Sequence, residues 1–166
     1  MDEDQPTRSK ASLAVGLAVS IAVCGLAGAI GAIATADSVT GDWFVKLAKP
    51  AWNPPNWIFG PVWSILYLMM GIAAWLVWKQ AGLAKAKFAL AWFGFHLMLN
   101  TAWSILFFGM EQSGWAAIEI VVLWLSIAIS MRLFFRHSKL AAGLLIPYLM
   151  WVSFATCLNF AIWSLN

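Results

Sequence analysis

Charged residues are scarce in this chain: they make up 10% of its 166 residues, whereas 63% are hydrophobic. A soluble domain of this size cannot bury so large an apolar fraction in its core, so a soluble globular fold is excluded. Bases exceed acids by only three, 10 against 7, and no basic cluster is available to bind nucleic acid. The composition therefore indicates an integral membrane protein whose main partner is the lipid bilayer.

Motifs for catalysis or metal binding are also missing. The sequence has no phosphate-binding glycine loop, no histidine and cysteine cluster and no nucleophile with a plausible base. Its two cysteines, Cys24 and Cys157, lie in separate apolar runs and predict neither a disulfide nor a metal site. We therefore expect no catalytic residue, no bound metal and no required cofactor.

Long apolar runs, in contrast, dominate the chain. Each is long enough to cross a hydrocarbon core, which takes about 20 apolar residues, and none shows the alternating pattern of a barrel strand. The sequence thus predicts an all-α integral membrane protein, a five-transmembrane-helix bundle. After a polar tail over 1–10, a single domain over 11–164 would contain spans at about 11–36, 57–78, 88–109, 114–135 and 140–164.

The distribution of bases predicts the orientation of the bundle. Eight bases fall on the side of the N-terminus, against two, Lys46 and Lys49, on the other. The positive-inside rule then places the N-terminus in the cytoplasm. The eight are Arg8, Lys10, Lys79, Lys85, Lys87, Arg132, Arg136 and Lys139. The first run, which follows Arg8 and Lys10, could instead be a cleaved signal peptide, but its length to about Ala36 favours a membrane span.

Residues 49–63 form a segment rich in proline and tryptophan between the first two spans. Its four prolines exclude a regular helix across the segment. Such a rigid, aromatic loop is poorly suited to free solvation, so we expect residues 37–56 to fold over the bundle as a pocket lid. Its central residues are Trp52, Asn53, Pro54 and Pro55.

Small residues recur at every fourth position of the first span, from Ser12 to Ala36. This spacing keeps them on one helix face, where they allow another helix to approach closely. A packing seam inside the bundle is favoured over a dimer face or a ligand contact.

Polar residues within the later spans predict their inward faces. His96, Asn100, Trp103 and Phe107 share one face of the third span, and lipid offers their polar groups no hydrogen-bond partner. His96 is interpreted as structural, with heme ligation as the alternative. For Glu119, a structural role near the helix start competes with a buried functional carboxylate.

The 12 tryptophans fall into two groups. Trp78, Trp115 and Trp163 lie near span ends, as interfacial anchors do. Trp63, Trp103 and Trp151 lie deeper and share helix faces with polar groups, which is typical of an internal aromatic pocket.

Ordered motifs from about Asp42 to Trp163 resemble the translocator protein family, also called tryptophan-rich sensory proteins or peripheral-type benzodiazepine receptors. These motifs are Lys49-Pro50-Ala51-Trp52-Asn53-Pro54-Pro55, Gly60-Pro61-Val62-Trp63, Tyr67, Asn100-Thr101-Ala102-Trp103, Phe107-Phe108-Gly109, Pro147-Tyr148, Trp151 and Phe154-Ala155-Thr156-Cys157-Leu158-Asn159.

The resemblance implies a five-helix bundle that binds tetrapyrroles such as protoporphyrin IX and heme, sterols and benzodiazepine-type ligands. It also implies a homodimer with the third span at the interface. Phe160 replaces the tyrosine of the sterol motif found in animal relatives, and no base follows it, so a bacterial-type, porphyrin-binding member is expected. The pocket residues that the resemblance implies are Phe59, Trp63, Tyr67, Asn100, Trp103, Ser104, Trp115, Trp151, Ala155 and Leu158.

Together these features predict a non-enzymatic membrane binding protein that senses, sequesters or transports tetrapyrroles or related apolar molecules. Two alternatives stay open. One is an enzyme for light-dependent porphyrin breakdown in which Trp63 and Trp151 carry electrons or radicals. The other is a regulatory membrane partner protein whose pocket is incidental.

Overall fold

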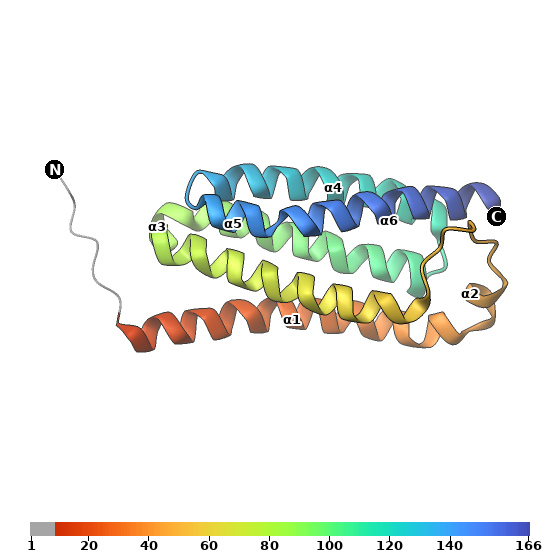
Figure 1. The fold of residues 1–166 in the computed structure, drawn as a ribbon, viewed down its shortest axis with the longest axis horizontal. Helices are drawn as coiled ribbons and strands as arrows, with labels where there is room; N and C mark the ends of the chain where they lie inside the picture. The colour runs from red at the N-terminus through yellow and green to blue at the C-terminus, as the bar shows by residue number, and fades with distance from the viewer. Residues whose placement is uncertain (1–8) are drawn as a thin grey trace.

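Helices make up nearly all of residues 9–166, the part of the chain that this computed structural model describes (Figure 1). The polar tail over residues 1–8, with Arg8, lies outside it. The α-helices are α1 (Lys10–Thr40), α2 (Asp42–Lys46), α3 (Phe59–Ser104), α4 (Ser113–Phe135), α5 (Lys139–Leu144) and α6 (Ile146–Leu165). A 3-10 turn, Asn56–Ile58, precedes α3, and a π-helical turn, Ile105–Gly109, follows it.

Four segments of the described chain are long and apolar enough to cross a membrane: Lys10–Ala36, Asn56–Gly109, Ser113–Phe135 and Lys139–Leu165. This differs from the five separate spans that the sequence predicts, because spans 57–78 and 88–109 both belong to α3. The chain reverses at Gly82, whose φ of 72° and ψ of 166° belong to a region that essentially only glycine occupies. The two arms of α3 consequently run antiparallel (Figure 1).

The last predicted span, 140–164, is also interrupted. It consists of α5 and α6, which meet at Leu145. Pro147 lies in the first turn of α6, and proline has no N–H to continue the hydrogen bonds of a preceding helix.

The predicted loop over 37–56 is shorter than the sequence indicates. α1 continues through Thr40, and α2 follows after Gly41. Phe44 of α2 packs against Phe108 in the π-helical turn, with ring centroids 5.7 Å apart. Ser38 Oγ donates to the Phe108 carbonyl at 2.7 Å. Contacts with this turn therefore accompany helical structure in residues whose sequence alone indicates a loop.

Small residues allow α1 to pack closely on the first arm of α3. A Cβ added at Gly71 would lie 2.8 Å from the Ile21 Cα, so the two backbones are in contact. The Trp75 indole also donates to the Leu13 carbonyl at 3.0 Å. Backbone contact of this kind is what small residues provide in membranes, where lipid is as apolar as the helices.

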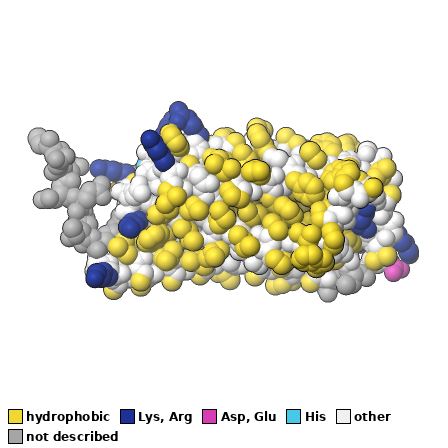
Figure 2. Space-filling model, in the orientation of Figure 1, with side chains coloured by type: hydrophobic (Ala, Val, Ile, Leu, Met, Phe, Trp, Pro, Cys, Tyr) yellow, Lys and Arg dark blue, Asp and Glu magenta, His cyan; other side chains and the backbone are white. Residues whose placement is uncertain are grey.

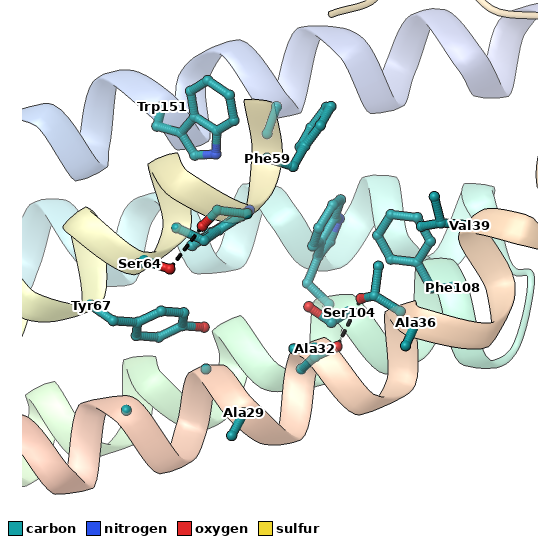
Figure 3. A pocket seen from close by; sticks show the side chains of 18 of the residues that line it. Ala29, Ala32, Ala36, Val39, Phe59, Ser64, Tyr67, Ser104, Phe108 and Trp151 are labelled. Carbon is teal, nitrogen blue, oxygen red and sulfur yellow. Dashed lines mark hydrogen bonds between the residues drawn. The ribbon is translucent and has the colours of Figure 1, made fainter. Parts of the chain in front are cut away.

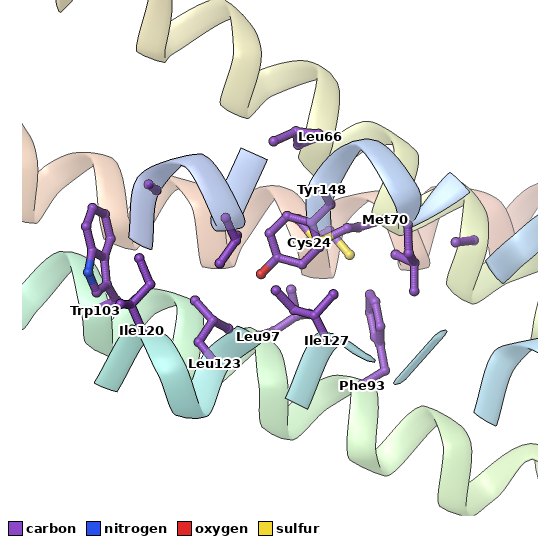
Figure 4. Close-up of a cluster of buried hydrophobic side chains, with 14 of the residues drawn as sticks. Cys24, Leu66, Met70, Phe93, Leu97, Trp103, Ile120, Leu123, Ile127 and Tyr148 are labelled. Carbon is purple, nitrogen blue, oxygen red and sulfur yellow. The ribbon is translucent and has the colours of Figure 1, made fainter. Parts of the chain in front are cut away.

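The interior lies between α3, α4 and α6 (Figure 4). His96, Asn100, Trp103 and Phe107 are all at most 9% exposed, which confirms the predicted inward face of the third run. Hydrophobic side chains cover much of the outer surface between the two ends of the bundle, where Lys and Arg gather (Figure 2).

Substituting Gly71 and Gly94 with alanine should change stability in opposite directions. Gly71→Ala forces a methyl group against the Ile21 backbone and should lower the free energy of unfolding by about 1–3 kcal/mol. A Cβ at Gly94 meets nothing within 4 Å, so Gly94→Ala should raise it by about 0.5–1 kcal/mol through helix propensity. Unfolding in mixed micelles measures both variants, and equal effects would contradict the close α1–α3 contact.

Candidate ligand-binding site

A pocket of about 620 Å³ lies between α1, α3 and α6 at the end of the bundle that carries α2 (Figure 3). Phe44 of α2 and Phe108 of the π-helical turn close it at that end. Exposed residues lie on both of its long edges, Ala29 and Ala32 on α1 and Ser64 and Leu68 on α3. The pocket therefore opens to the outside of the bundle between these two helices.

Aromatic rings from α3 and α6 form one wall. Phe59 and Trp151 meet edge to face with ring centroids 5.7 Å apart. One turn further along α3, Trp63 lies 5.6 Å from Tyr67 and 6.2 Å from Tyr148. Such a wall offers π-faces and edges to a flat apolar molecule.

α1 supplies the opposite wall through residues with little or no side chain. Gly28, Ala32 and Ala36 of the small-residue stripe line the pocket, as do Ala29 and Gly31. The packing seam predicted from this stripe is thus only part of its role, because toward this end of the bundle the same spacing leaves empty volume beside α1. Sequence reasoning missed this wall, and the density of Gly and Ala from Gly25 to Ala36 was the available signal.

A buried hydrogen-bond network holds the floor of the pocket. Tyr67 donates its hydroxyl to Asn100 Oδ1, and Asn100 Nδ2 donates to the Tyr148 hydroxyl at 3.0 Å. The Trp103 indole donates to Asn159 Oδ1 at 3.0 Å. Asn100 is 1% exposed and does not line the cavity, so it orients Tyr67 and Tyr148 from behind the wall.

Few polar groups face the cavity. The Ser64 and Thr35 hydroxyls both donate to backbone carbonyls of their own helices, at 2.9 and 2.8 Å. The Trp151 Nε1 is buried without a hydrogen-bond partner in the described chain. Because an unpaired buried donor is costly, this N–H is suited to pair with an acceptor on a bound molecule.

The structure brings seven of the ten expected pocket residues together in the lining: Phe59, Trp63, Tyr67, Trp103, Ser104, Trp151 and Ala155. Of the other three, Asn100 lies behind the wall and Leu158 is 7% exposed in the packed interior.

Trp115 lies outside the pocket. It is 65% exposed, and its indole lines a separate hollow beside Trp43 and Trp163. The reason is its place on α4, where the next two residues, Ala116 and Ala117, are fully buried and turn the Trp115 side chain outward.

The four central residues of the expected lid also lie outside the lining, although Val39, Phe44 and Asn56 of the same segment take part in it. Trp52 reaches the site indirectly. It packs edge to face on Phe154 at 5.7 Å, and Phe154 in turn contacts Trp151 at 5.5 Å.

His96 and Glu119 belong to the interior of the bundle. His96 is 0% exposed, with Nδ1 3.1 Å from the Ser130 hydroxyl. It does not line the pocket and so is not placed to ligate a heme there. Both carboxylate oxygens of Glu119 are buried without a hydrogen-bond partner in the described chain, and no side-chain hydrogen bond caps α4.

Comparison with known proteins gives one consistent family. The TspO/MBR family model matches residues 20–164. The tryptophan-rich protein TspO of Chlorobaculum tepidum is 43% identical over 154 residues, 90% of this chain and 95% of that protein. The human translocator protein is 42% identical over 126 residues, 75% of each chain. Protein CrtK of Rhodobacter capsulatus is 39% identical over 153 residues, 90% of this chain and 91% of that protein.

The family model matches most of the chain, and these relatives are about 40% identical to it. Similarity of this extent shows a common family and not only a common fold. The multi-helix membrane architecture and the tryptophan-rich pocket are in keeping with it. The chain belongs to the TspO/MBR family.

Proposed function

We propose that this protein is a non-enzymatic membrane protein that binds a flat, apolar ligand of the tetrapyrrole class, such as protoporphyrin IX or heme. The observation that carries the proposal is the aromatic-walled pocket of about 620 Å³, a volume in the range of small-molecule sites, about 300–1,000 Å³. A macrocycle would stack against Phe59, Trp63 and Trp151, with its opposite face on the small residues of α1.

The polar groups of the pocket suit a ligand with few hydrogen-bond acceptors. The unpartnered Trp151 Nε1 and the Asn56 carboxamide at the rim supply orienting donors. Lys49, the base that precedes Asn56 in the first loop, donates to the Phe44 and Leu47 carbonyls, and its Nζ lies 4.2 Å from the centre of the Phe44 ring. Partial burial lowers the pKa of Lys49 below its ordinary value of 10.5.

Titration with protoporphyrin IX in the dark and in light tests the function. Binding predicts saturable tryptophan quenching with an unchanged porphyrin spectrum in both conditions. Light-dependent breakdown, for which the unpaired Trp151 indole is the favouring observation, predicts a new absorbing product at catalytic turnover. Absence of saturable quenching in both conditions would contradict both functions.

Filling the pocket from α1 should block binding. Ala32→Phe places a ring inside the lining, and the resulting overpacking should cost about 2 kcal/mol, or about a thirtyfold rise in Kd. Ile33 is its neighbour on the same helix, is 74% exposed and does not line the pocket. Ile33→Phe therefore serves as the matched control and should bind like the parent. Equal affinities of the two variants would place the ligand elsewhere.

Removing the orienting donor should weaken binding without unfolding the protein. Trp151→Phe keeps an aromatic ring against Phe59 but removes an N–H that has no partner in the described chain. The loss of one hydrogen bond to ligand should cost about 1 kcal/mol, or about a fivefold rise in Kd. Trp57→Phe, at a 74% exposed position outside the lining, is the control, and quenching amplitudes are calibrated for each variant. An unchanged Kd in Trp151→Phe would show that its indole donates to no ligand atom.

We further propose that residues 37–56 act as a lid and that the protein forms a homodimer through the second arm of α3. For the lid, the support is that Phe44 and Asn56 line the pocket while Trp52 packs on the Trp151 neighbour Phe154. For the dimer, it is a row of exposed apolar side chains along that arm and at the start of the π-helical turn, from 40% to 66% exposed: Phe88, Phe95, Met98 and Ile105.

The reversal at Gly82 supports five membrane crossings, because each arm of α3 can cross the membrane separately. The distribution of bases supports a cytoplasmic N-terminus. In this topology the start of α1, the Gly82 turn and the turn between α4 and α5 share the cytoplasmic end. Lys79, Lys85, Lys87, Arg132, Arg136 and Lys139 lie near these turns in the sequence.

Cysteine labelling tests this topology. In a background of Cys24→Ala and Cys157→Ala, single cysteines replace Ala51 in the first loop or Ala84 beside Gly82, both at exposed positions. An impermeant maleimide should label Ala51→Cys in intact cells, and Ala84→Cys only after permeabilisation. The reverse pattern would invert the topology, and labelling of both in intact cells would contradict two separate crossings by α3.

A further inference from the structure

A second hollow, of about 530 Å³, lies at the same end of the bundle as α2 and is distinct from the ligand pocket. We call it the outer hollow. Three indoles line it, from α2, the start of α4 and the end of α6, together with polar residues of the turn before α4 and of the chain end. The six that matter here are Trp43, Trp115, Trp163, Glu111, Gln112 and Asn166.

The outer hollow is built by specific packing. Trp163 lies directly over Gly114, where an added Cβ would come within 2.8 Å of its Nε1. The Asn166 carboxamide pairs with both backbone groups of Ala48, accepting from its N–H at 3.0 Å and donating to its carbonyl at 3.1 Å. The end of α6 is thereby joined to the first loop around the hollow.

Glu111, in the turn before α4, has an unusual backbone conformation. Its φ is 57°, and it is the one residue of the described chain, apart from glycine, with a positive φ. Side chains with a Cβ adopt this left-handed region infrequently, and such residues concentrate at functional sites. Glu111 thus joins an infrequent backbone conformation with a place in the lining of the outer hollow, which also contains three tryptophans.

Indole faces together with one carboxylate are the chemistry that recognises an organic ammonium group. No lysine or arginine of the described chain lines the outer hollow, so no side-chain base neutralises Glu111 there. We propose that the outer hollow binds the cationic headgroup of a zwitterionic membrane phospholipid, with a quaternary ammonium preferred.

The surroundings of the hollow indicate that the ammonium group belongs to a lipid of the bilayer. Polar lining residues, Glu111 to Ser113, lie at the start of α4, and Trp115 and Ile118 follow within its first turns. Exposed apolar side chains then continue down one face of α4 at alternating spacings of three and four residues. They are Trp115, Ile118, Val122, Leu125 and Ile129, each from 44% to 65% exposed. A headgroup in the hollow would therefore have its acyl chains along this face.

Native mass spectrometry of the full chain tests the proposal. The protein is exchanged into detergent with equimolar phosphatidylcholine, phosphatidylethanolamine and phosphatidylglycerol of identical acyl chains. We expect retention in the order choline, ethanolamine, glycerol. Glu111→Gln and Trp163→Ala should each lower choline-lipid retention about fivefold, and Trp163→Phe should recover part of it.

Matched controls separate this site from general lipid adhesion. Asp42→Asn removes a 93% exposed carboxylate at the same end, and Trp57→Ala removes a 74% exposed indole; neither residue lines the hollow. Both should retain lipid like the parent. Helical content and elution volume show whether each variant is folded. If Trp163→Ala unfolds, the single variants Glu111→Gln and Trp163→Phe are compared with the parent instead. Equal retention of the three lipids, or equal losses in control and site variants, overturns the proposal.

Discussion

Close backbone contact between α1 and the first arm of α3 determines where this protein can hold a ligand. Near Gly71 the two helices touch at the Ile21 backbone, and Ile21 is the first residue of α1 that lines the pocket. Toward α2 the Tyr67 ring lies over Gly28, and Phe59 and Trp63 of α3 line the pocket together with small residues of α1. Aromatic side chains of α3 and mainly small residues of α1 thus line the volume that remains between the two helices.

The pocket floor depends on polar groups that satisfy one another away from water. In the water-free interior of a membrane protein, an amide or hydroxyl without a hydrogen-bond partner costs several kcal/mol. Asn100 accepts from Tyr67 and donates to Tyr148, and Asn159 accepts from Trp103 and donates to the Ser113 carbonyl at 2.8 Å. These two asparagines tie α3, α4 and α6 together and fix the orientation of the rings that a ligand would meet.

Hydropathy and helical periodicity account for the apolar segments and for the inward face from His96 to Phe107, because burial in a helix repeats at a spacing that the sequence displays. They place a reversal between residues 78 and 88, but they do not identify the residue that makes it, which is Gly82 with its positive φ. They also do not show whether a small residue meets a backbone or a void, so the α1 wall was missed. At Trp115, the resemblance implied a pocket residue while the position near a span end predicted an interfacial anchor, and its exposed side chain outside the pocket agrees with the second prediction.

α2 connects the two cavities through adjacent residues. Phe44 closes the ligand pocket, while Trp43 lines the outer hollow. Their rings pack on Phe108 at 5.7 Å and on Phe107 at 5.8 Å, both in the π-helical turn, a rare conformation that often occurs at functional sites. Because one short helix presents both aromatic rings, a movement of α2 that withdraws Phe44 from the pocket must also displace Trp43. Occupants of the two cavities would consequently act on the same element, each favouring the position of α2 that it contacts best.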